Sequence, residues 1–341
     1  MAKTLAVIYR PKKFEDVCEQ KNVIGILKNQ LASGECKNAY LFCGGAGTGK
    51  TTCARIFANE LNGGKGVPIE IDGASNNGVE NVRGIIEQAK YLPLEGQYKV
   101  YIIDECHMLS IGAWNAMLKL LEEPPARTIF IFCTTDPQKI PATILSRVQK
   151  YDFCRISREG IVARLEYICK QENLTANKDA LEYLATLAAG GMRDAISLMD
   201  KCFSYSKELT LESATQALGL VSHDTLLKIL ADIKRADVEG VLAKIDEVYR
   251  RGLDIKQFIK SFATFVIDLT IYATTGETIF TRLPSSYKVI VDNLLKQYSN
   301  ADLLELMSGV LKLQNDVKYD PSPLPLVQAF FVKLAYQEDK K

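Results

Sequence analysis

The sequence predicts an α/β fold built on a five-stranded parallel sheet, followed by a long region made only of helices. In residues 1–157, short apolar runs typical of buried strands alternate with segments of helical periodicity, which is the pattern of repeated strand–helix–strand units. Beyond about Ser157 the strand signals stop, and apolar residues recur every three or four positions. The five expected strands are Tyr40–Cys43, Ile69–Asp72, Val100–Asp104, Thr128–Thr134 and Lys150–Phe153.

The segments between these strands predict amphipathic helices on both faces of the sheet. The expected helices lie near Thr51–Asn62, Val79–Leu92 and Ile111–Glu122. In the last of these, the apolar residues from Trp114 to Leu121 recur at positions i, i+3, i+4 and i+7, which places them on one helix face.

The remainder of the chain predicts two further domains without a sheet. Residues 158–220 indicate several short helices interrupted at Gly190-Gly191, and residues 221–341 indicate longer ones. Apolar stripes at 238–248, 258–269 and 303–313 are interpreted as core packing and carry no chemistry of their own. The predicted domains are therefore residues 1–157, 158–220 and 221–341.

Composition excludes several classes of protein. The 341 residues contain 42 Lys and Arg against 41 Asp and Glu, so a net charge of +1 gives no general attraction to nucleic acid or membranes. No apolar run approaches the roughly 18 residues that a membrane span needs, and Met1–Arg10 lacks the apolar core of a signal peptide. The nine cysteines form no C-x-x-C pair and are interpreted as buried free thiols. We expect a cytoplasmic protein that does not contact a membrane.

The strongest motif is a glycine-rich loop after the first strand. It fits G-x-x-x-x-G-K-[ST] and opens a helix, which is the context that a phosphate-binding loop requires. The glycines let backbone N–H groups surround phosphates at a helix N-terminus. Lys50 is expected to reach the β- and γ-phosphates and the Thr51 hydroxyl to bind Mg²⁺. The residues expected to hold the nucleotide here are Gly44, Gly45, Ala46, Gly47, Thr48, Gly49, Lys50, Thr51 and Thr52.

An acidic pair ends the third predicted strand. Asp104 is expected to hold magnesium through water, and Glu105 to polarise the water that attacks the nucleotide. An acidic pair at the end of a strand is common by itself. Its occurrence in the same chain as a phosphate loop favours the catalytic interpretation. Asp104 to His107 also spell D-E-x-H, which raises the possibility of a helicase. His107 itself is interpreted as a local hydrogen-bonding partner.

Polar residues at three further places in the chain are candidates for sensing the nucleotide. Thr134 and Thr135 end a very apolar strand, so their hydroxyls are expected at the carboxyl edge of the sheet. Arg147 and Arg193 follow later in the chain, and on their own they are no more than ordinary surface arginines.

The chain resembles the gamma/tau subunits of the bacterial DNA polymerase III clamp loader, which are AAA+ ATPases. The resemblance covers about residues 5–200, and Pro124-Pro125 and the stretch Thr135–Pro141 are its most specific parts. The stretches that carry it are Tyr9-Arg10-Pro11 with Phe14, the phosphate loop, Glu70–Ser75, Lys99–Leu109, Leu118–Pro125, Thr134–Arg147 and Gly190–Asp200. Residues 221–341 resemble the collar domain of this family only in helical character and position.

This resemblance implies an AAA+ P-loop domain, a small helical lid domain and an all-α collar domain. It implies an ATPase that uses ATP and Mg²⁺ and works as the motor subunit of a sliding-clamp loader. The implied partners are the sliding clamp, delta-like and delta-prime-like subunits in a pentameric ring, and primed DNA. It also implies roles: Thr135 is sensor 1, Arg193 is sensor 2, and Arg147 is the arginine finger that reaches a neighbouring subunit. Tyr9, Arg10 and Pro11 are then expected near the adenine.

The chain departs from the family pattern in two places. The family usually carries a four-cysteine zinc module after the phosphate-loop helix, whereas Leu61–Pro68 connects the elements directly and contains no cysteine. We therefore expect a short form without a zinc site and without the tau extension. The family's Ser-Arg-Cys motif reads Ser146-Arg147-Val148, which keeps the arginine. DNA contacts at Asn76, Asn77 and Lys139 are a weaker inference from the same resemblance.

Three other interpretations remain open from the sequence. Another AAA+ nucleic-acid motor, for branch migration or helicase loading, is possible, but the stretches Thr135–Pro141 and Glu122–Pro125 argue against it. A D-E-x-H helicase would need a second α/β motor domain, and residues 157–341 predict only helices. A non-catalytic scaffold would not need the intact set of Lys50, Asp104, Glu105 and Arg193.

Overall fold

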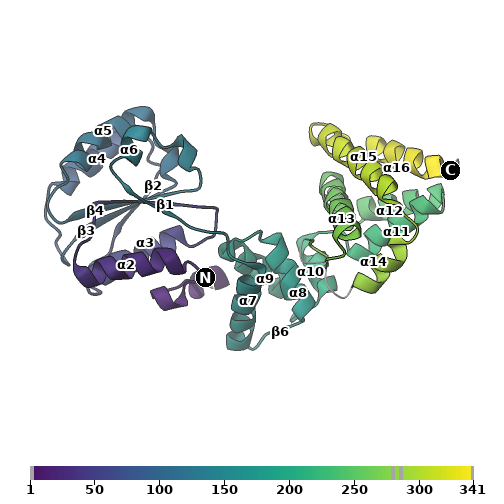
Figure 1. Cartoon of the computed structure of the whole chain (residues 1–341), viewed down its shortest axis with the longest axis horizontal. Coiled ribbons are helices and arrows are strands. Elements are labelled where there is room, and N and C mark those ends of the chain that lie inside the picture. Colours follow the sequence, from purple (N-terminus) through teal and green to yellow (C-terminus); the bar gives the residue numbers. More distant parts are fainter. Residues whose placement is uncertain (1–3, 278–280, 284–286, 339–341) are drawn as a thin grey trace. The chain divides into compact units, whose positions relative to one another are not determined.

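The computed structural model describes residues 4–277, 281–283 and 287–338, and these form two compact units (Figure 1). The first unit contains the chain up to Ile168 together with Leu187–Ser197, and the second contains Cys169–Thr186 and the chain from Leu198 onward. The division falls within helices, so it does not delimit the three predicted domains, whose boundaries stay predictions. The outermost residues of those predicted domains, 1–3 and 339–341, lie outside the described residues.

The first unit is built on the predicted parallel sheet of five strands. The strands are β1 (Ala39–Cys43), β2 (Ile69–Asp72), β3 (Lys99–Asp104), β4 (Thr128–Thr134) and β5 (Gln149–Asp152). Their order in the sheet is β2-β3-β4-β1-β5, and every neighbouring pair is parallel. The fifth strand lies one residue earlier than predicted, because Tyr40 to Cys43 of β1 pair with Gln149 to Asp152.

Helices cover both faces of this sheet (Figure 1). One face packs against α2 (Lys21–Ser33) and α3 (Lys50–Leu61), the other against α4 (Val79–Ala89), α5 (Ile111–Glu122) and α6 (Ala142–Leu145). Alternate residues of β1 enter the two cores: Tyr40 and Phe42 enter one, Leu41 and Cys43 the other. A strand buried on both faces gives the continuous apolar runs that the sequence displays.

Short segments complete the first unit. They are α1 (Leu5–Ile8) and the 3₁₀ turns η1 (Phe14–Asp16), η2 (Cys106–Met108) and η3 (Pro137–Lys139). The predicted helix at Val79–Leu92 ends at Ala89 instead. Its predicted end was wrong because Pro93 disfavours a helical conformation at the residue before it.

Three helices, α7 (Arg158–Glu172), α8 (Lys178–Leu187) and α9 (Met192–Tyr205), follow the sheet. The expectation that no strand occurs after Ser157 was wrong, since β6 (Thr175–Ala176) pairs in parallel with β7 (Glu208–Leu209). Each strand is only two residues long, too short to leave a pattern in the sequence.

The second unit has its core in a helical bundle. Its later helices are α10 (Leu211–Leu218), α11 (His223–Lys234), α12 (Val238–Arg250), α13 (Ile255–Thr275), α14 (Lys288–Leu295), α15 (Asn300–Lys318) and α16 (Leu324–Glu338). The apolar stripes predicted at 238–248, 258–269 and 303–313 lie on α12, α13 and α15. Phe258 and Phe262 of α13 pack on Phe331 of α16, with ring centroids 6.0 and 5.1 Å away. These stripes are core packing, as predicted.

Two predictions from composition, on membrane spans and on buried cysteines, can be compared with the described residues. No helix in the described ranges is both long and apolar enough to cross a bilayer. The nine cysteines are all free, but only six are buried; Cys18 and Cys36 are partly exposed and Cys154 is exposed. The prediction of buried thiols was therefore wrong for these three, which lie in loops.

Candidate functional site

The glycine-rich loop lies at the carboxyl end of β1 and leads into α3. Gly44, Gly47 and Gly49 have φ values of 151°, 69° and 101°, a region that residues with a Cβ rarely adopt. Gly47 also approaches the chain after α8, because a Cβ there would lie 3.0 Å from Cα of Gly191. The N-cap of α3 is Gly49, which has no side chain to accept the first N–H groups of the helix. These N–H groups therefore remain available to bind an anion inside the loop.

Lys50 begins α3 and folds back over the loop. Its side chain is buried, and Nζ donates hydrogen bonds to the carbonyl oxygens of Gly44 at 2.9 Å and Gly45 at 2.8 Å. Burial lowers the pKa of Lys50 from its ordinary value, and the nearby carboxylates of Glu105 and Asp104 oppose that shift. A buried cation at a helix N-terminus favours a phosphate ligand.

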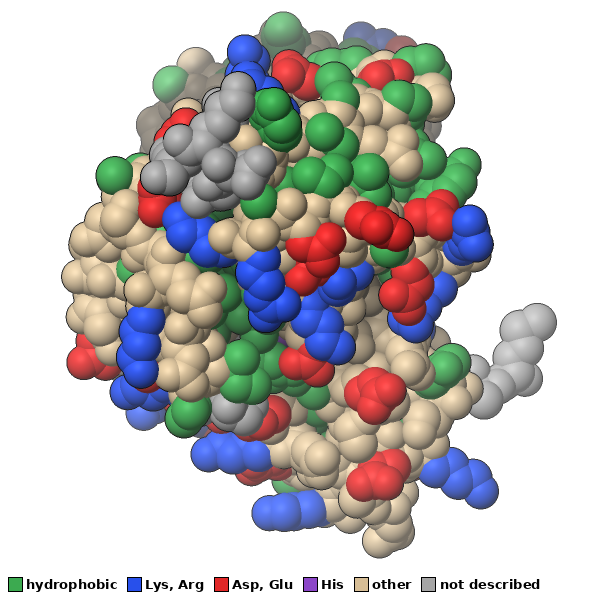
Figure 2. All heavy atoms as spheres, turned by 90° about the vertical axis from the view of Figure 1, so that its right-hand side faces the viewer, with side chains coloured by type: hydrophobic (Ala, Val, Ile, Leu, Met, Phe, Trp, Pro, Cys, Tyr) green, Lys and Arg blue, Asp and Glu red, His purple; other side chains and the backbone are tan. Residues whose placement is uncertain are grey.

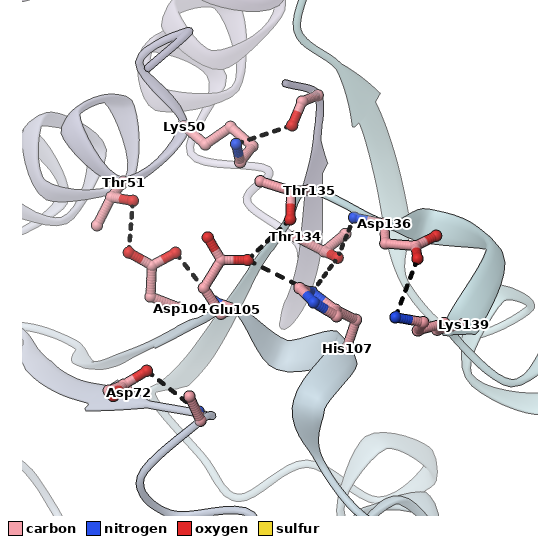
Figure 3. A network of polar contacts seen from close by, with 12 residues as sticks. Lys50, Thr51, Asp72, Asp104, Glu105, His107, Thr134, Thr135, Asp136 and Lys139 are labelled. Atoms are coloured by element: carbon pink, nitrogen blue, oxygen red, sulfur yellow. Dashed lines mark hydrogen bonds and ion pairs between the residues drawn. The ribbon is translucent and has the colours of Figure 1, made fainter. Parts of the chain in front are cut away.

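Thr51 and Asp104 meet at the next position, one from α3 and one from the end of β3 (Figure 3). The Thr51 hydroxyl donates to Oδ2 of Asp104 at 2.8 Å, and the Glu105 N–H donates to Oδ1 of Asp104 at 3.0 Å. A hydroxyl and a carboxylate this close offer only hard oxygen donors. Magnesium, which prefers one or two carboxylates plus phosphate oxygens and water, fits this donor set.

Glu105 occupies a tight turn directly after β3. Its backbone has φ 45° and ψ 42°, a left-handed conformation that is uncommon for a residue with a long side chain. Gly73 makes room for this turn: its N–H donates to the Asp104 carbonyl at 2.7 Å, and a Cβ on it would lie 2.8 Å from the Glu105 carbonyl oxygen. Thr135, the residue directly after β4, donates its hydroxyl hydrogen to Oε2 of Glu105 at 3.0 Å.

The loop, the acidic turn and the helix α9 enclose one pocket of about 430 Å³. The predicted residues Tyr9, Arg10 and Pro11 line it, as do Ala46 to Thr52, Asp104, Glu105 and Arg193. Gly44, Gly45 and Thr135 are not among its lining residues; Gly44 and Gly45 lie under Lys50, and Thr135 lies behind Glu105.

Several lining residues were missed by sequence reasoning. They include Val17, Cys18, Arg55, Ile156, Arg164 and Asp194. Arg164 of α7 donates to the carbonyl oxygen of Tyr9 at 3.0 Å and its guanidinium lies over the ring of Tyr167. Arg164 is one of several charged residues on a helix, and nothing in its sequence spacing distinguishes it from surface positions.

Arg147 lies apart from this pocket. It follows α6 and pairs with Glu122 of α5 at 2.6 Å, and it also donates to the Thr143 carbonyl at 2.7 Å. Arg147 is not among the residues that line the pocket. Asn76 and Asn77 lie in the loop after β2, and Lys139 pairs with Asp136 at 3.3 Å.

The family models divide the chain into three matched stretches. A model described as "DNA polymerase III, delta subunit" matches residues 65–157. A model for the "DNA polymerase III clamp loader subunit, ATPase lid domain" matches residues 160–208. The "DNA polymerase III subunits gamma and tau domain III" model matches residues 209–341.

Curated relatives point to the same family. The chain is 38% identical to the DNA polymerase III subunit tau of Bacillus subtilis, with 96% of this chain and 62% of the relative aligned. It is 38% identical to the tau subunit of Escherichia coli, covering 73% of this chain and 42% of the relative. The chain thus spans about half the length of these two relatives. The DNA polymerase III subunit gamma of Buchnera aphidicola subsp. Baizongia pistaciae is 35% identical, and 70% of each chain is covered.

Solved structures of RuvB from Thermotoga maritima resemble the fold. The structure titled as the Holliday junction branch migration motor matches with a TM-score of 0.53 and 17% identity, covering 74% of this chain and 90% of that one. The parallel sheet, the phosphate loop and the helical domains after it define this chain as an AAA+ P-loop protein. Within that class, it belongs to the family of DNA polymerase III gamma and tau subunits.

The close approach of Gly73 to the acidic turn leads to a stability prediction. Gly73→Ala should lower the free energy of unfolding of the first unit by about 1–3 kcal/mol, because the new Cβ meets two backbone carbonyl oxygens at 2.8 and 2.9 Å. The measurement is chemical denaturation followed by fluorescence of Trp114, the single tryptophan, which is buried in the same unit.

Gly84→Ala is the matched control for this substitution. Gly84 lies inside α4, and no neighbouring atom lies within 4 Å of the added Cβ. The control should raise the free energy of unfolding by about 0.5–1 kcal/mol, because alanine restricts the unfolded chain more than glycine does. A Gly73→Ala protein as stable as the wild type would contradict the close packing of this turn.

Proposed function

We propose that this chain is the ATP-hydrolysing motor subunit of a DNA sliding-clamp loader. The observation that carries the proposal is the meeting of the phosphate loop, with the buried Lys50, and the Thr51–Asp104 pair at one edge of the sheet. Membership of the gamma and tau family supports it, and one family model that matches the chain is named for a clamp-loader subunit. In this family the site implies a nucleotide and a divalent metal, and we propose ATP and Mg²⁺.

The residues of the loop would bind the nucleotide through charge and hydrogen bonds. The N–H groups of Gly47 to Thr52 would surround the phosphates, and Lys50 would exchange its two carbonyl partners for β- and γ-phosphate oxygens. Thr51 and Asp104 would hold the metal, which when bound supplies positive charge next to the phosphates. Tyr9, Arg10 and Pro11 line the same pocket and would contact the adenine.

Glu105 would orient the water that attacks the γ-phosphate. Its carboxylate accepts the hydroxyl hydrogen of Thr135, which holds it next to the pocket. Through this contact, Thr135 would act as sensor 1. Arg193, near the start of α9, lines the pocket and would contact the phosphates as sensor 2. This helix joins the phosphate loop through the hydrogen bond from the Met192 N–H to the Gly47 carbonyl, at 3.0 Å.

The proposed partners are a sliding clamp, delta-like and delta-prime-like subunits in a pentameric ring, and primed DNA. On the face seen in Figure 2, Lys and Arg side chains are mixed with Asp and Glu, in keeping with the net charge of +1. A mixed surface attracts the DNA backbone weakly. Affinity for DNA should therefore come from a few contacts that several subunits supply together.

A branch-migration motor is the second candidate among AAA+ proteins. The likeness to RuvB is 17% in sequence and supports the shared fold alone. The relatives at 35–38% identity are DNA polymerase III subunits, and they favour the clamp-loader function. The two functions can be distinguished by measuring which DNA structure, primed DNA or a four-way junction, stimulates ATP hydrolysis.

The proposal predicts separate effects for Lys50→Ala and Glu105→Gln. Lys50→Ala should weaken ATP binding strongly, because the phosphates lose the buried cation of the loop. Glu105→Gln should bind ATP but hydrolyse it about 10²–10⁴ times more slowly, because only the activation of water is removed. Both are measured in the assembled complex with clamp and primed DNA, by ATP affinity and by the rate of phosphate release.

The wild-type complex is the control in that experiment. Its rate of hydrolysis is measured once with primed DNA and clamp, and once with a four-way DNA junction in place of the primed DNA. Primed DNA together with the clamp should accelerate hydrolysis more than the junction does. Stimulation by the junction alone would contradict clamp loading, and equal ATP affinity of wild type and Lys50→Ala would contradict the nucleotide site.

We also propose that Arg147 acts on the site of a neighbouring subunit. Its guanidinium pairs with Glu122 at a position that does not line its own pocket. An arginine that acts in trans contributes about 10³–10⁵ in rate. Lys50→Ala and Arg147→Ala oligomers should each be nearly inactive, and mixing them should restore part of the ATPase activity.

Restoration is expected because some interfaces in the mixture join an intact loop to an intact arginine. Sizing first establishes that subunits exchange. With exchange established, a mixture that stays inactive would mean that Arg147 serves its own subunit.

A further inference from the structure

From its sequence context, His107 is expected only to form a local hydrogen bond. In the structure it lies in the short η2 turn, two residues beyond Glu105, and its side chain is only 11% exposed. The left-handed conformation of Glu105 reverses the chain at this point, and the turn is held by the hydrogen bond from the Met108 N–H to the Glu105 carbonyl at 3.0 Å. As Figure 3 shows, His107 and Glu105 therefore point toward the same place, the end of β4.

His107 connects the buried strand end to the carboxylate of Glu105. Its Nδ1 lies 3.1 Å from Oγ1 of Thr134 and 3.4 Å from Oε2 of Glu105 (Figure 3). Thr134 is fully buried, and its hydroxyl oxygen also accepts the N–H of Asp136 at 3.0 Å. The Thr134 oxygen is thus fixed by the backbone, and His107 bridges this fixed point to the half-exposed Glu105.

The neighbours of His107 indicate which of its ring nitrogens carries the hydrogen. A lone pair on Nδ1 would face the negative Oε2 of Glu105, which is repulsive, whereas an N–H there attracts it. Nδ1–H is therefore the favoured form, directed between the Thr134 and Glu105 oxygens. The hydroxyl of Thr135 donates to the same Oε2. Two neighbouring threonines at the end of β4 thus act on one carboxylate oxygen, Thr135 directly and Thr134 through His107.

These contacts fix the rotation of the Glu105 carboxylate. The side chain of Glu105 is 40% exposed, so without partners it would sample several rotamers. Both contacts engage Oε2, and among the described residues no other side chain bonds to this carboxylate. The second oxygen, Oε1, is then the one available to accept a hydrogen from water.

We propose that His107 is a positioning residue that sets the orientation of Glu105 for water activation and contributes to hydrolysis but little to nucleotide binding. This inference rests on the proposed ATPase function. His107 is not among the residues that line the pocket, so its effect on the reaction passes through Glu105. A histidine that only filled space below the turn would need no nitrogen at the Nδ1 position.

The test compares three substitutions that differ at this atom. In His107→Asn, the amide nitrogen is bonded to Cγ as Nδ1 is, so it keeps a donor in the same place. In His107→Gln, the amide lies one carbon further out, and His107→Leu has no donor. Each variant is assayed in the assembled complex for ATP affinity, for the single-turnover rate of hydrolysis, and for its unfolding midpoint.

His107→Leu and His107→Gln should hydrolyse bound ATP about 10- to 100-fold more slowly, the cost of a misplaced reacting group. His107→Asn should retain a rate close to the wild type, and all three should bind ATP within about threefold of it. Thr134→Val should slow hydrolysis in the same way, and combining it with His107→Leu should add little, because both remove the same connection.

A wild-type rate in His107→Leu, or equal rates in His107→Asn and His107→Gln, would overturn the proposal. If His107→Leu unfolds, the comparison of Asn with Gln still decides the question. Failure of the underlying function has a different signature: the wild-type complex would then hydrolyse no ATP, or Lys50→Ala would bind ATP as tightly as the wild type.

Discussion

The parallel pairing of β3, β4 and β1 is the constraint on which the site depends. Because parallel strands all end at the same edge of a sheet, the loop after β1 and the polar residues after β3 and β4 come together although they are far apart in the chain. The register is specific: Cys43 pairs with Thr134, and the Gly44 N–H then bonds to the Thr134 carbonyl at 3.2 Å. A shift of one residue between β1 and β4 would turn the threonine hydroxyls to the opposite faces of the sheet.

The strong burial of this sheet explains how it can hold polar groups in fixed positions. Every residue of β1 and β4 is buried, and the side chains alternate between two apolar cores. At the carboxyl edge the chain leaves these cores, and there Gly44 and Glu105 adopt backbone conformations with positive φ. Strain of about 1–3 kcal/mol at such a residue persists only where the surrounding structure enforces it. The free energy gained by burying the strands therefore offsets the strain in the turns of the site.

Much of the fold and site could be predicted from the sequence because both depend on local patterns. The strands Ile69–Asp72 and Thr128–Thr134 have the predicted bounds: the first alternates apolar and acidic residues, and the second is a continuous buried run that ends at threonine. The placement of the phosphate loop before α3 and of Asp104 at the end of β3 was predictable because the motif requires those residue types at fixed positions along the chain; their role in binding a nucleotide stays a prediction. The roles assigned to Thr135, Arg147 and Arg193 came from a family resemblance and stay predictions.

Features that depend on distant contacts could not be predicted. The contact between Arg164 and the Tyr9 carbonyl joins positions 155 residues apart, and no periodicity marks either of them. The position of His107 depends on the left-handed turn at Glu105, and the sequence gives no sign of positive φ at a glutamate. The short β6–β7 pair likewise forms between segments that are separated by two helices.

Calorimetric titration of the wild-type chain with ATP shows whether this edge of the sheet forms one metal–nucleotide site. We expect saturable binding of about one ATP per chain in the presence of Mg²⁺. Binding should be markedly weaker when the metal is chelated, because Thr51 and Asp104 then hold no cation next to the phosphates. Absence of saturable binding, or an affinity that does not change when magnesium is removed, would contradict a shared metal–nucleotide site.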